Sequence, residues 1–331
     1  MTRVWTPGAV TGLGSLPGTD PAEAARLVFG ELPDLPHLPE LPDRGPAADL
    51  IGRGIATLVD LPAEIVPSGW RLASRPGADL RRARDLLAWD LDALEEQAEG
   101  YAGPLKIQVV GPWTLAATVE LPTGHRVVSD TGATRDLAAS LAEGLRQHLD
   151  GIARRVPGAA LVVQLDEPAL PTVLRGTVPT PSGYGMVRAV EESTAETVLS
   201  DLLALAPTTV VHCCAADVPI ALLQRAGADA VALDAALLTT GHNDALGEAI
   251  DAGLSLWLGV VPSESTPDLP RARATIRTLW SALGFGADLL PERVVPTPAC
   301  GLAGSTPERV RAVLSLLRDV GRDLVDPTEL S

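Results

Sequence analysis

Short apolar runs rich in valine, isoleucine and leucine alternate along this chain with longer stretches of helical periodicity. Continuous apolar runs are typical of parallel strands buried on both faces, and their alternation with helices is typical of βα units. We expect eight strands, near residues 9–15, 36–41, 105–111, 160–166, 208–214, 230–235, 256–261 and 293–299. Eight βα repeats predict an α/β fold of the (β/α)8 TIM-barrel type, with residues 1–331 forming one barrel.

Helical periodicity fills the gaps between the predicted strands. The predicted helices cover residues 21–29, 80–98, 134–155, 192–205, 219–226, 243–252, 269–283 and 306–320. Residues 42–75 are rich in proline and glycine, and we interpret them as a long loop with a helix near 45–59 that covers the active site. An open doubly wound sheet is the alternative. It is disfavoured because no G-x-G-x-x-G pattern follows a predicted strand.

The amino-acid composition limits the kinds of molecule that this chain is expected to bind. The net charge of −16 is spread along the chain, which argues against nucleic acid or an anionic membrane as a partner. No apolar run approaches the roughly 20 residues that span a bilayer, and the first residues do not resemble a signal peptide. The three cysteines, two of them adjacent, favour a reducing compartment, so we expect a cytoplasmic protein.

All three cysteines lie in two motifs at predicted strand ends, Val211-His-Cys-Cys214 and Pro298-Ala-Cys-Gly301. Side chains at i and i+2 of a strand share a face, so His212 and Cys214 can converge, with Cys300 as a third ligand. One imidazole and two thiolates suit Zn²⁺ and leave a fourth position open. The alternative is a buried histidine and small apolar cysteines in the core.

Carboxylates end two further strands. Asp234 is a candidate fourth zinc ligand, a candidate acceptor for the His212 ring N–H, or an N-cap of the next helix. Asp166 and Glu167 are adjacent, so at most one of them faces the barrel mouth, where it can hold a substrate ammonium group. The alternative there is a salt bridge to an arginine.

The first two predicted strands end at polar residues as well. Ser15 follows Gly12-Leu-Gly14, and its hydroxyl can bind a carboxylate, although a simple turn explains the same pattern. Glu40 ends the second predicted strand. The carboxyl ends of barrel strands build the active site, so these side chains are expected to converge with the metal ligands.

The predicted ligand set suits a thiol substrate. A free thiol has a pKa near ~8.5, whereas a thiol bound to a metal is deprotonated. Zinc held by thiolates is electron-rich, so the bound substrate thiolate stays nucleophilic enough to attack a methyl group. A His₃ or His₂Glu site would better activate water.

These motifs resemble the C-terminal catalytic barrel of the cobalamin-independent methionine synthase family. The matching segments are Gly14-Ser-Leu-Pro17, Gly111-Pro112, Gln164-Leu-Asp-Glu-Pro-Ala169, His212-Cys-Cys214 and Pro298-Ala-Cys-Gly-Leu302. The resemblance implies a single-barrel form without that family's N-terminal barrel.

The resemblance also implies roles for individual residues. The implied zinc ligands are His212, Cys214 and Cys300, with Asp234 at the position of the family's zinc-ligating glutamate. Homocysteine would be held by Ser15, Glu40 and Asp166, and Asp166 is the implied catalytic carboxylate. The implied activity is methylation of homocysteine or a related thiol, with methyltetrahydrofolate or a methylcorrinoid protein as methyl donor.

The chain departs from the family pattern at two places that concern the methyl donor. The Asp-x-His of the seventh strand is replaced by Gly259-Val-Val-Pro-Ser263, and the Lys-Thr-Arg after Cys-Gly-Leu is replaced by Ala303-Gly-Ser305. Two alternatives to a methyltransferase stay open at this point. One is a metal-free decarboxylase or lyase of the uroporphyrinogen decarboxylase type, and the other is a zinc- or thiol-binding protein without catalysis.

Overall fold

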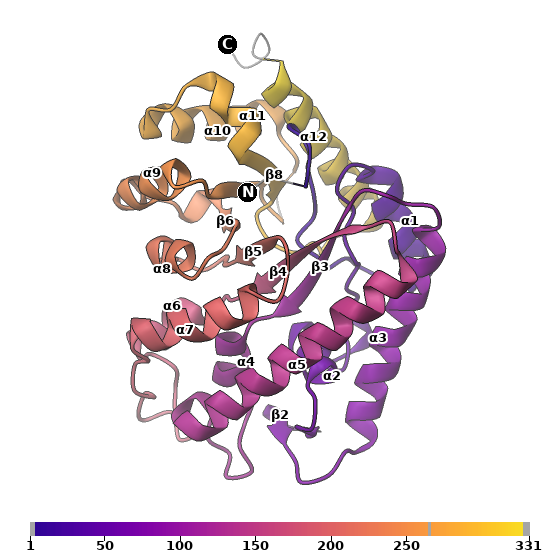
Figure 1. Ribbon diagram of the computed structural model, residues 1–331, viewed down its shortest axis with the longest axis vertical. Coiled ribbons are helices and arrows are strands. Elements are labelled where there is room, and N and C mark those ends of the chain that lie inside the picture. Colours follow the sequence, from indigo (N-terminus) through magenta and orange to yellow (C-terminus); the bar gives the residue numbers. More distant parts are fainter. Residues whose placement is uncertain (1–3, 264–265, 327–331) are drawn as a thin grey trace.

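A six-stranded, all-parallel sheet forms the centre of the computed structural model, which describes residues 4–263 and 266–326. The strands lie in chain order and curl into a half-barrel with helices on its outer side (Figure 1). They confirm the last six of the eight predicted strands. Their bounds are β3 (Pro104–Val110), β4 (Ala160–Asp166), β5 (Thr209–His212), β6 (Ala230–Asp234), β7 (Ser255–Val261) and β8 (Val294–Pro298).

The first two predicted strands are not regular strands in the described chain. Residues 36–40 lie beside β3 through an isolated bridge between His37 and Lys106, and Ser15 forms another with Glu40. Past β8, the Leu302 amide donates to the Ser15 carbonyl at 2.8 Å. Prolines at positions 36 and 39 lack the N–H groups that a ladder needs. The predicted eight-stranded sheet is therefore present as six paired strands and two bridged segments.

All eight predicted helices are present. They are α1 (Pro21–Glu31), α3 (Ala78–Gln97), α5 (Thr131–Arg155), α7 (Glu192–Leu203), α8 (Ile220–Arg225), α9 (Asn243–Asp251), α10 (Leu269–Leu283) and α12 (Pro307–Val325). In α12 the Thr306 hydroxyl accepts from the Arg309 amide, and residues such as Val310, Val313 and Leu317 bury one face. This is the capped, amphipathic pattern expected of a helix that covers a sheet.

Additional short helices fill the connections between the longer elements. They are α2 (Leu50–Thr57), α4 (Pro112–Thr118), α6 (Leu170–Arg175) and α11 (Leu290–Arg293). Of these, α2 falls inside the predicted 45–59 helix but is shorter. Asp49 caps it by accepting from the Gly52 amide at 2.8 Å.

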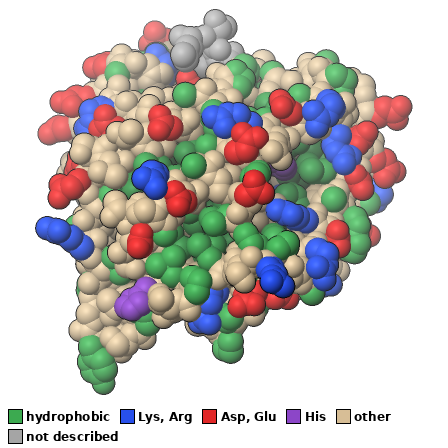
Figure 2. Space-filling view, turned by 60° about the horizontal axis from the view of Figure 1, so that its bottom comes forward, with side chains coloured by type: hydrophobic (Ala, Val, Ile, Leu, Met, Phe, Trp, Pro, Cys, Tyr) green, Lys and Arg blue, Asp and Glu red, His purple; other side chains and the backbone are tan. Residues whose placement is uncertain are grey.

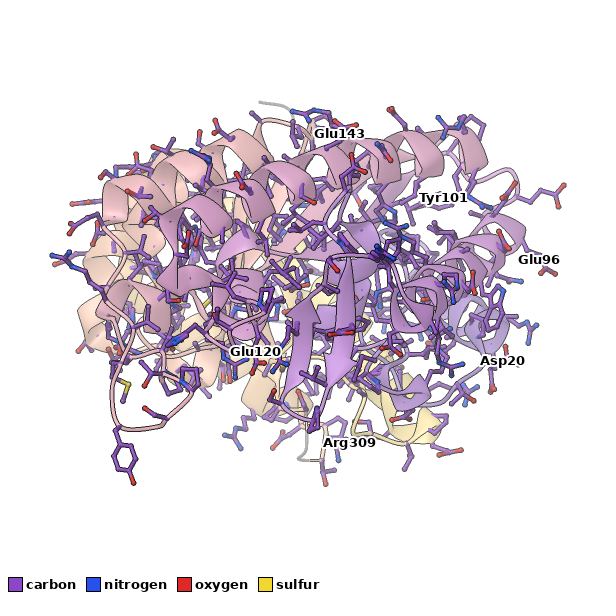
Figure 3. All side chains as sticks on the ribbon, turned by 90° about the horizontal axis from the view of Figure 1, so that it is seen from below. Asp20, Glu96, Tyr101, Glu120, Glu143 and Arg309 are labelled. Atoms are coloured by element: carbon purple, nitrogen blue, oxygen red, sulfur yellow. The ribbon has the colours of Figure 1, made fainter. Side chains whose placement is uncertain are left out.

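A β-hairpin follows α2 that the sequence did not predict. It pairs β1 (Ala63–Val66) with β2 (Gly69–Leu72) in antiparallel register. Glu120 lies beside the hairpin (Figure 3) and accepts from Arg71 at 2.8 Å. The Trp70 indole donates to the Pro46 carbonyl at 3.0 Å, which ties the hairpin to the segment that leads into α2.

The outer surface mixes both signs of charge. On the face shown in Figure 2, acidic and basic side chains are interspersed and hydrophobic side chains gather near the middle. Among residues 4–263 and 266–326, no helix is both long enough and apolar enough to cross a membrane.

Candidate metal and substrate site

A cavity of about 350 Å³ lies at the carboxyl ends of the strands. Six of the seven predicted site residues line it, and Asp234 does not. The lining residues are Leu13, Ser15, Glu40, Pro42, Ala48, Asp49, Leu50, Asp166, Pro168, His212, Cys214, Cys300 and Gly301. Residues from both ends of the chain thus meet in one pocket, as a barrel active site requires.

Two cysteine thiols approach each other in this pocket. Cys214 lies just past the end of β5 and Cys300 just past the end of β8, with their sulfur atoms 3.6 Å apart. Two sulfurs bound at ~2.3 Å to one tetrahedral zinc would be about 3.8 Å apart, so the spacing fits a shared metal. Their hydrogen bond lowers the pKa of Cys300 to about 6 and raises that of Cys214.

Cys213 faces away from the pocket, as the strand alternation predicts. Its side chain is 1% exposed and belongs to the hydrophobic core. Burial raises its pKa to about 12. The thiol is therefore protonated at neutral pH and plays a packing role.

One ring nitrogen of His212 lies against a carboxylate, and the other has no hydrogen-bond partner among the described residues. Its Nδ1 atom lies 2.7 Å from Asp166 Oδ1, and the two residues are register partners on β5 and β4. Its Nε2 atom is buried and has no hydrogen-bond partner among the described residues. An imidazole fixed by a carboxylate at one nitrogen is the usual arrangement of a metal-bound histidine.

Asp234, the predicted fourth ligand, lies at the end of β6 and is not among the residues that line the cavity. Its carboxylate accepts from the Ala236 amide at 2.9 Å and caps the short turn after β6. The N-cap alternative is thus the interaction present, and the acceptor for the His212 ring is Asp166 instead. The sequence did not reveal this because register between β4 and β5 cannot be read from residue spacing.

Asp166 and its neighbour Glu167 point in opposite directions, as predicted. Glu167 is fully buried and accepts from the Trp113 and Thr114 amides at 2.9 and 2.8 Å, which caps the start of α4. Burial raises the pKa of Glu167 to about 7, and these hydrogen bonds oppose the shift. The pocket therefore contains only the carboxylate of Asp166 from this pair.

Glu40 reaches the pocket with a buried ionic network behind it. Arg53 on α2 lies 3.3 Å from Glu40 and also pairs with Asp90, which binds Arg44 at 2.8 Å. Burial raises the pKa of Glu40 to about 7, while the charge of Arg53 acts in the opposite direction. Arg53 and Asp90 could not be predicted as part of the site, because both lie on helices whose contact partners are far away in the chain.

Ser15 lies beside a glycine that the pocket requires. A Cβ atom on Gly301 would come within 1.9 Å of the Ser15 hydroxyl oxygen, so only glycine leaves the Ser15 side chain in place. Gly14, the preceding residue, has a positive φ of 131°, which an L side chain rarely adopts. These two glycines fix how Ser15 enters the cavity.

The described residues contain no group of three or more His, Cys, Asp and Glu side chains that forms a ready-made metal cluster. The donor atoms nevertheless fit a zinc ion. The two thiols have nearly the spacing of tetrahedral ligands, and the buried Nε2 of His212 lacks a partner.

The family model of the cobalamin-independent synthase catalytic domain matches residues 94–323, which is more than half of the chain. The chain belongs to this family. The match contains Asp166, His212, Cys214 and Cys300 of this synthase domain, whereas Ser15 and Glu40 precede it. No curated protein is matched by the sequence.

One solved structure of a cobalamin-independent synthase has a similar fold. A B12-independent methionine synthase from Shewanella sp. W3-18-1, in complex with selenomethionine, has a TM-score of 0.64 and 14% identity, covering 98% of this chain and 99% of that chain. The GH5_18-E153A protein from Streptomyces cattleya, in complex with Manb1-4GlcNAc, has 14% identity and a TM-score of 0.44, covering 96% and 80%. The first likeness supports the fold, and the second is too weak to bear on it.

Proposed function

We propose that this chain is a zinc-dependent S-methyltransferase that methylates homocysteine. The observation that carries the proposal is the pair of thiols of Cys214 and Cys300, 3.6 Å apart in the pocket that also contains His212. The family supports the activity class, because a methionine synthase needs an activated thiol. It does not favour the metal-free decarboxylase alternative, which has no use for these ligands.

The residues that would hold zinc are Cys214, Cys300 and His212 through Nε2. Zinc bound there would keep a fourth ligand, the thiol of the substrate, deprotonated at neutral pH. Asp166 fixes the His212 ring from the other side. A role of Asp234 as a further zinc ligand stays a prediction. In this structure its carboxylate accepts from the Ala236 amide.

The pocket also has groups for the amino-acid end of homocysteine. We assign Glu40 and Asp166 to the ammonium group and Ser15 to the carboxylate. Asp166 Oδ1 is already shared by His212 and Gln164, which leaves its other oxygen for the substrate. By this contact Asp166 is the proposed catalytic carboxylate, because it touches both the substrate and the histidine that would bind the metal.

Methyltetrahydrofolate is the first methyl donor to test, since it is the donor that the family implies. No described residue specifically favours a corrinoid protein. We further propose that residues 1–331 form one (β/α)8 catalytic barrel, in which the bridged segments 9–15 and 36–41 take the places of its first two strands. The two bridges, Ser15–Glu40 and His37–Lys106, support that assignment.

The proposed activity is tested by incubating zinc-loaded protein with homocysteine and methyltetrahydrofolate. The expected product is methionine, formed at a rate that depends on homocysteine. A matched reaction with Cys300→Ser protein is the control. Binding of zinc and homocysteine without methionine formation, with either methyltetrahydrofolate or a methylcorrinoid, would contradict the proposal and favour a non-catalytic zinc-binding protein.

Homocysteine binding is expected to weaken as the pH falls through about 7, the pKa of Glu40. Its pKa is raised in the folded protein, so the carboxylate that pairs with the ammonium group is lost below that pH. With one pKa unit equal to a factor of ten, binding at pH 6 should be about tenfold weaker than at pH 8. Glu40→Gln should bind weakly at both pH values. An unchanged ratio of dissociation constants in this variant would show that Glu40 is not the titrating group.

A further inference from the structure

The only lysine of the chain is buried under the proposed metal site. Lys106 lies on β3, and its side chain is 0% exposed. It does not line the cavity, so it cannot contact the substrate. Its ammonium nitrogen lies 2.6 Å from the side-chain oxygen of Gln164 on β4. The role of this buried amine therefore depends on what the Gln164 amide contacts.

Gln164 is fully buried, and its amide has only one orientation that satisfies its neighbours. Its Oε1 atom faces Lys106, which is a donor. Its Nε2 atom donates to the Leu13 carbonyl at 2.9 Å and to Asp166 Oδ1 at 2.7 Å, and a carbonyl can only accept. If the amide were flipped, its oxygen would face the oxygens of Leu13 and Asp166, which are acceptors. Its NH2 group would then face the amine of Lys106, which is a donor. Lys106 and Leu13 therefore fix the Gln164 N–H that points at Asp166.

The hydrogen bonds of Asp166 in turn fix the tautomer of His212. Asp166 Oδ1 accepts from Gln164 and lies 2.7 Å from His212 Nδ1. Because Asp166 Oδ1 is the acceptor for the Gln164 N–H, the geometry favours the same role for it toward His212, so that Nδ1 carries the proton and Nε2 carries the lone pair. The His212 Nε2 atom is buried without a hydrogen-bond partner among the described residues, as an atom reserved for a metal would be.

We propose that Lys106 and Gln164 are positioning residues that act through Asp166 to hold His212 in its Nδ1–H tautomer, with Nε2 free to bind zinc. The chain of contacts runs Lys106–Gln164–Asp166–His212 across three neighbouring strands. The metal in this inference rests on the proposed function, but the tautomer does not. It is a property of the protein without zinc.

Burial and two nearby carboxylates act on the amine of Lys106 in opposite directions. Burial lowers the pKa of Lys106 to about 7, while Asp166 and Glu40 act in the opposite direction. The two carboxylates thus stabilise the charged form of Lys106.

The tautomer can be read in the metal-free protein from the ¹⁵N NMR signals of the histidine rings, with His212→Gln used for assignment. The wild type is expected to show only the Nδ1–H form of His212. Gln164→Glu keeps the shape of the side chain and its contact to Lys106 but cannot donate to Asp166. It is expected to show a mixture of both tautomers. Lys106→Met, which replaces a buried amine by a side chain of similar length, is expected to do the same.

Zinc affinity gives an independent readout by competition with a chelator. Loss of a residue behind a metal-bound histidine typically weakens binding by about 10–100-fold, and we expect this for both variants. Gln108→Met is the matched control, because Gln108 is a buried glutamine on β3 whose amide bonds to the Leu38 carbonyl and not to Asp166. It should change neither readout.

Two outcomes would overturn the inference. One is a pure Nδ1–H tautomer of His212 in both Gln164→Glu and Lys106→Met, and the other is unchanged zinc affinity in both. If Lys106→Met does not fold, Gln164→Glu alone decides the test, since it retains Lys106 and an oxygen acceptor for its amine. Failure of the wild type to bind zinc would contradict the proposed function instead, and the tautomer measurement would still stand.

Discussion

Serine in place of Cys214 or Cys300 is expected to abolish zinc retention and methyl transfer. A serine hydroxyl is a hard, neutral ligand and cannot replace a thiolate in a soft site. Residues behind a ligand already change metal affinity by about 10–100-fold, so loss of a direct ligand should exceed about 100-fold. Zinc content after dialysis against a weak chelator measures the first effect, and methionine formation measures the second.

Cys213→Ser is the matched control for this prediction. The same chemical change is made next to Cys214, but on a side chain that is 1% exposed in the core. It should keep zinc while lowering the free energy of unfolding by about 1–3 kcal/mol, because a more polar hydroxyl replaces the thiol in the hydrophobic core. Full zinc occupancy in both Cys214→Ser and Cys300→Ser would contradict the assignment of these cysteines as zinc ligands.

Alanine in place of Gly144 is expected to cause the largest loss of stability among single glycine substitutions on α5. An added Cβ would lie 1.8 Å from the Thr57 carbonyl oxygen at the end of α2, and a backbone atom cannot move aside cheaply. Overpacking of this kind costs about 3 kcal/mol. Because α2 also carries Arg53, the partner of Glu40, homocysteine binding should weaken as well.

Gly151 on the same helix supplies the control. Nothing lies within 4 Å of a Cβ atom built there. Gly151→Ala should therefore stabilise the protein by up to about 1 kcal/mol through helix propensity. Midpoints of urea unfolding compare the two variants. Equal midpoints for Gly144→Ala and Gly151→Ala would show that α2 and α5 do not approach each other as closely as described.

The helices and six of the strands could be predicted because their signals are local. Apolar runs and capped amphipathic stretches mark β3 to β8 and the long helices within a few residues of their true ends. The hairpin β1–β2 was missed since its strands have four residues each, too short for a periodic pattern to stand out. The segments 9–15 and 36–41 have the right composition for strands, but prolines 36 and 39 leave them only single bridges.

The residues that line the candidate site could be predicted from the sequence, but the contacts between them could not. Residue types at predicted strand ends indicated that Ser15, Glu40 and the two cysteine motifs lie together, because parallel strands of a curled sheet end at one side, and these residues do line one cavity. The contact between Asp166 and His212 depends on the register of two strands, which spacing along the chain does not encode. The buried partners Arg53 and Lys106 depend on packing between elements that are distant in sequence.

The zinc site that binds the substrate thiol is tested most directly by the zinc content of the purified protein, combined with zinc-edge X-ray absorption with and without homocysteine. We expect one zinc per chain, bound by two sulfurs and one imidazole, which gains a sulfur ligand when homocysteine is added. A protein purified under reducing conditions that holds no zinc, and takes up none when zinc is supplied, would contradict it.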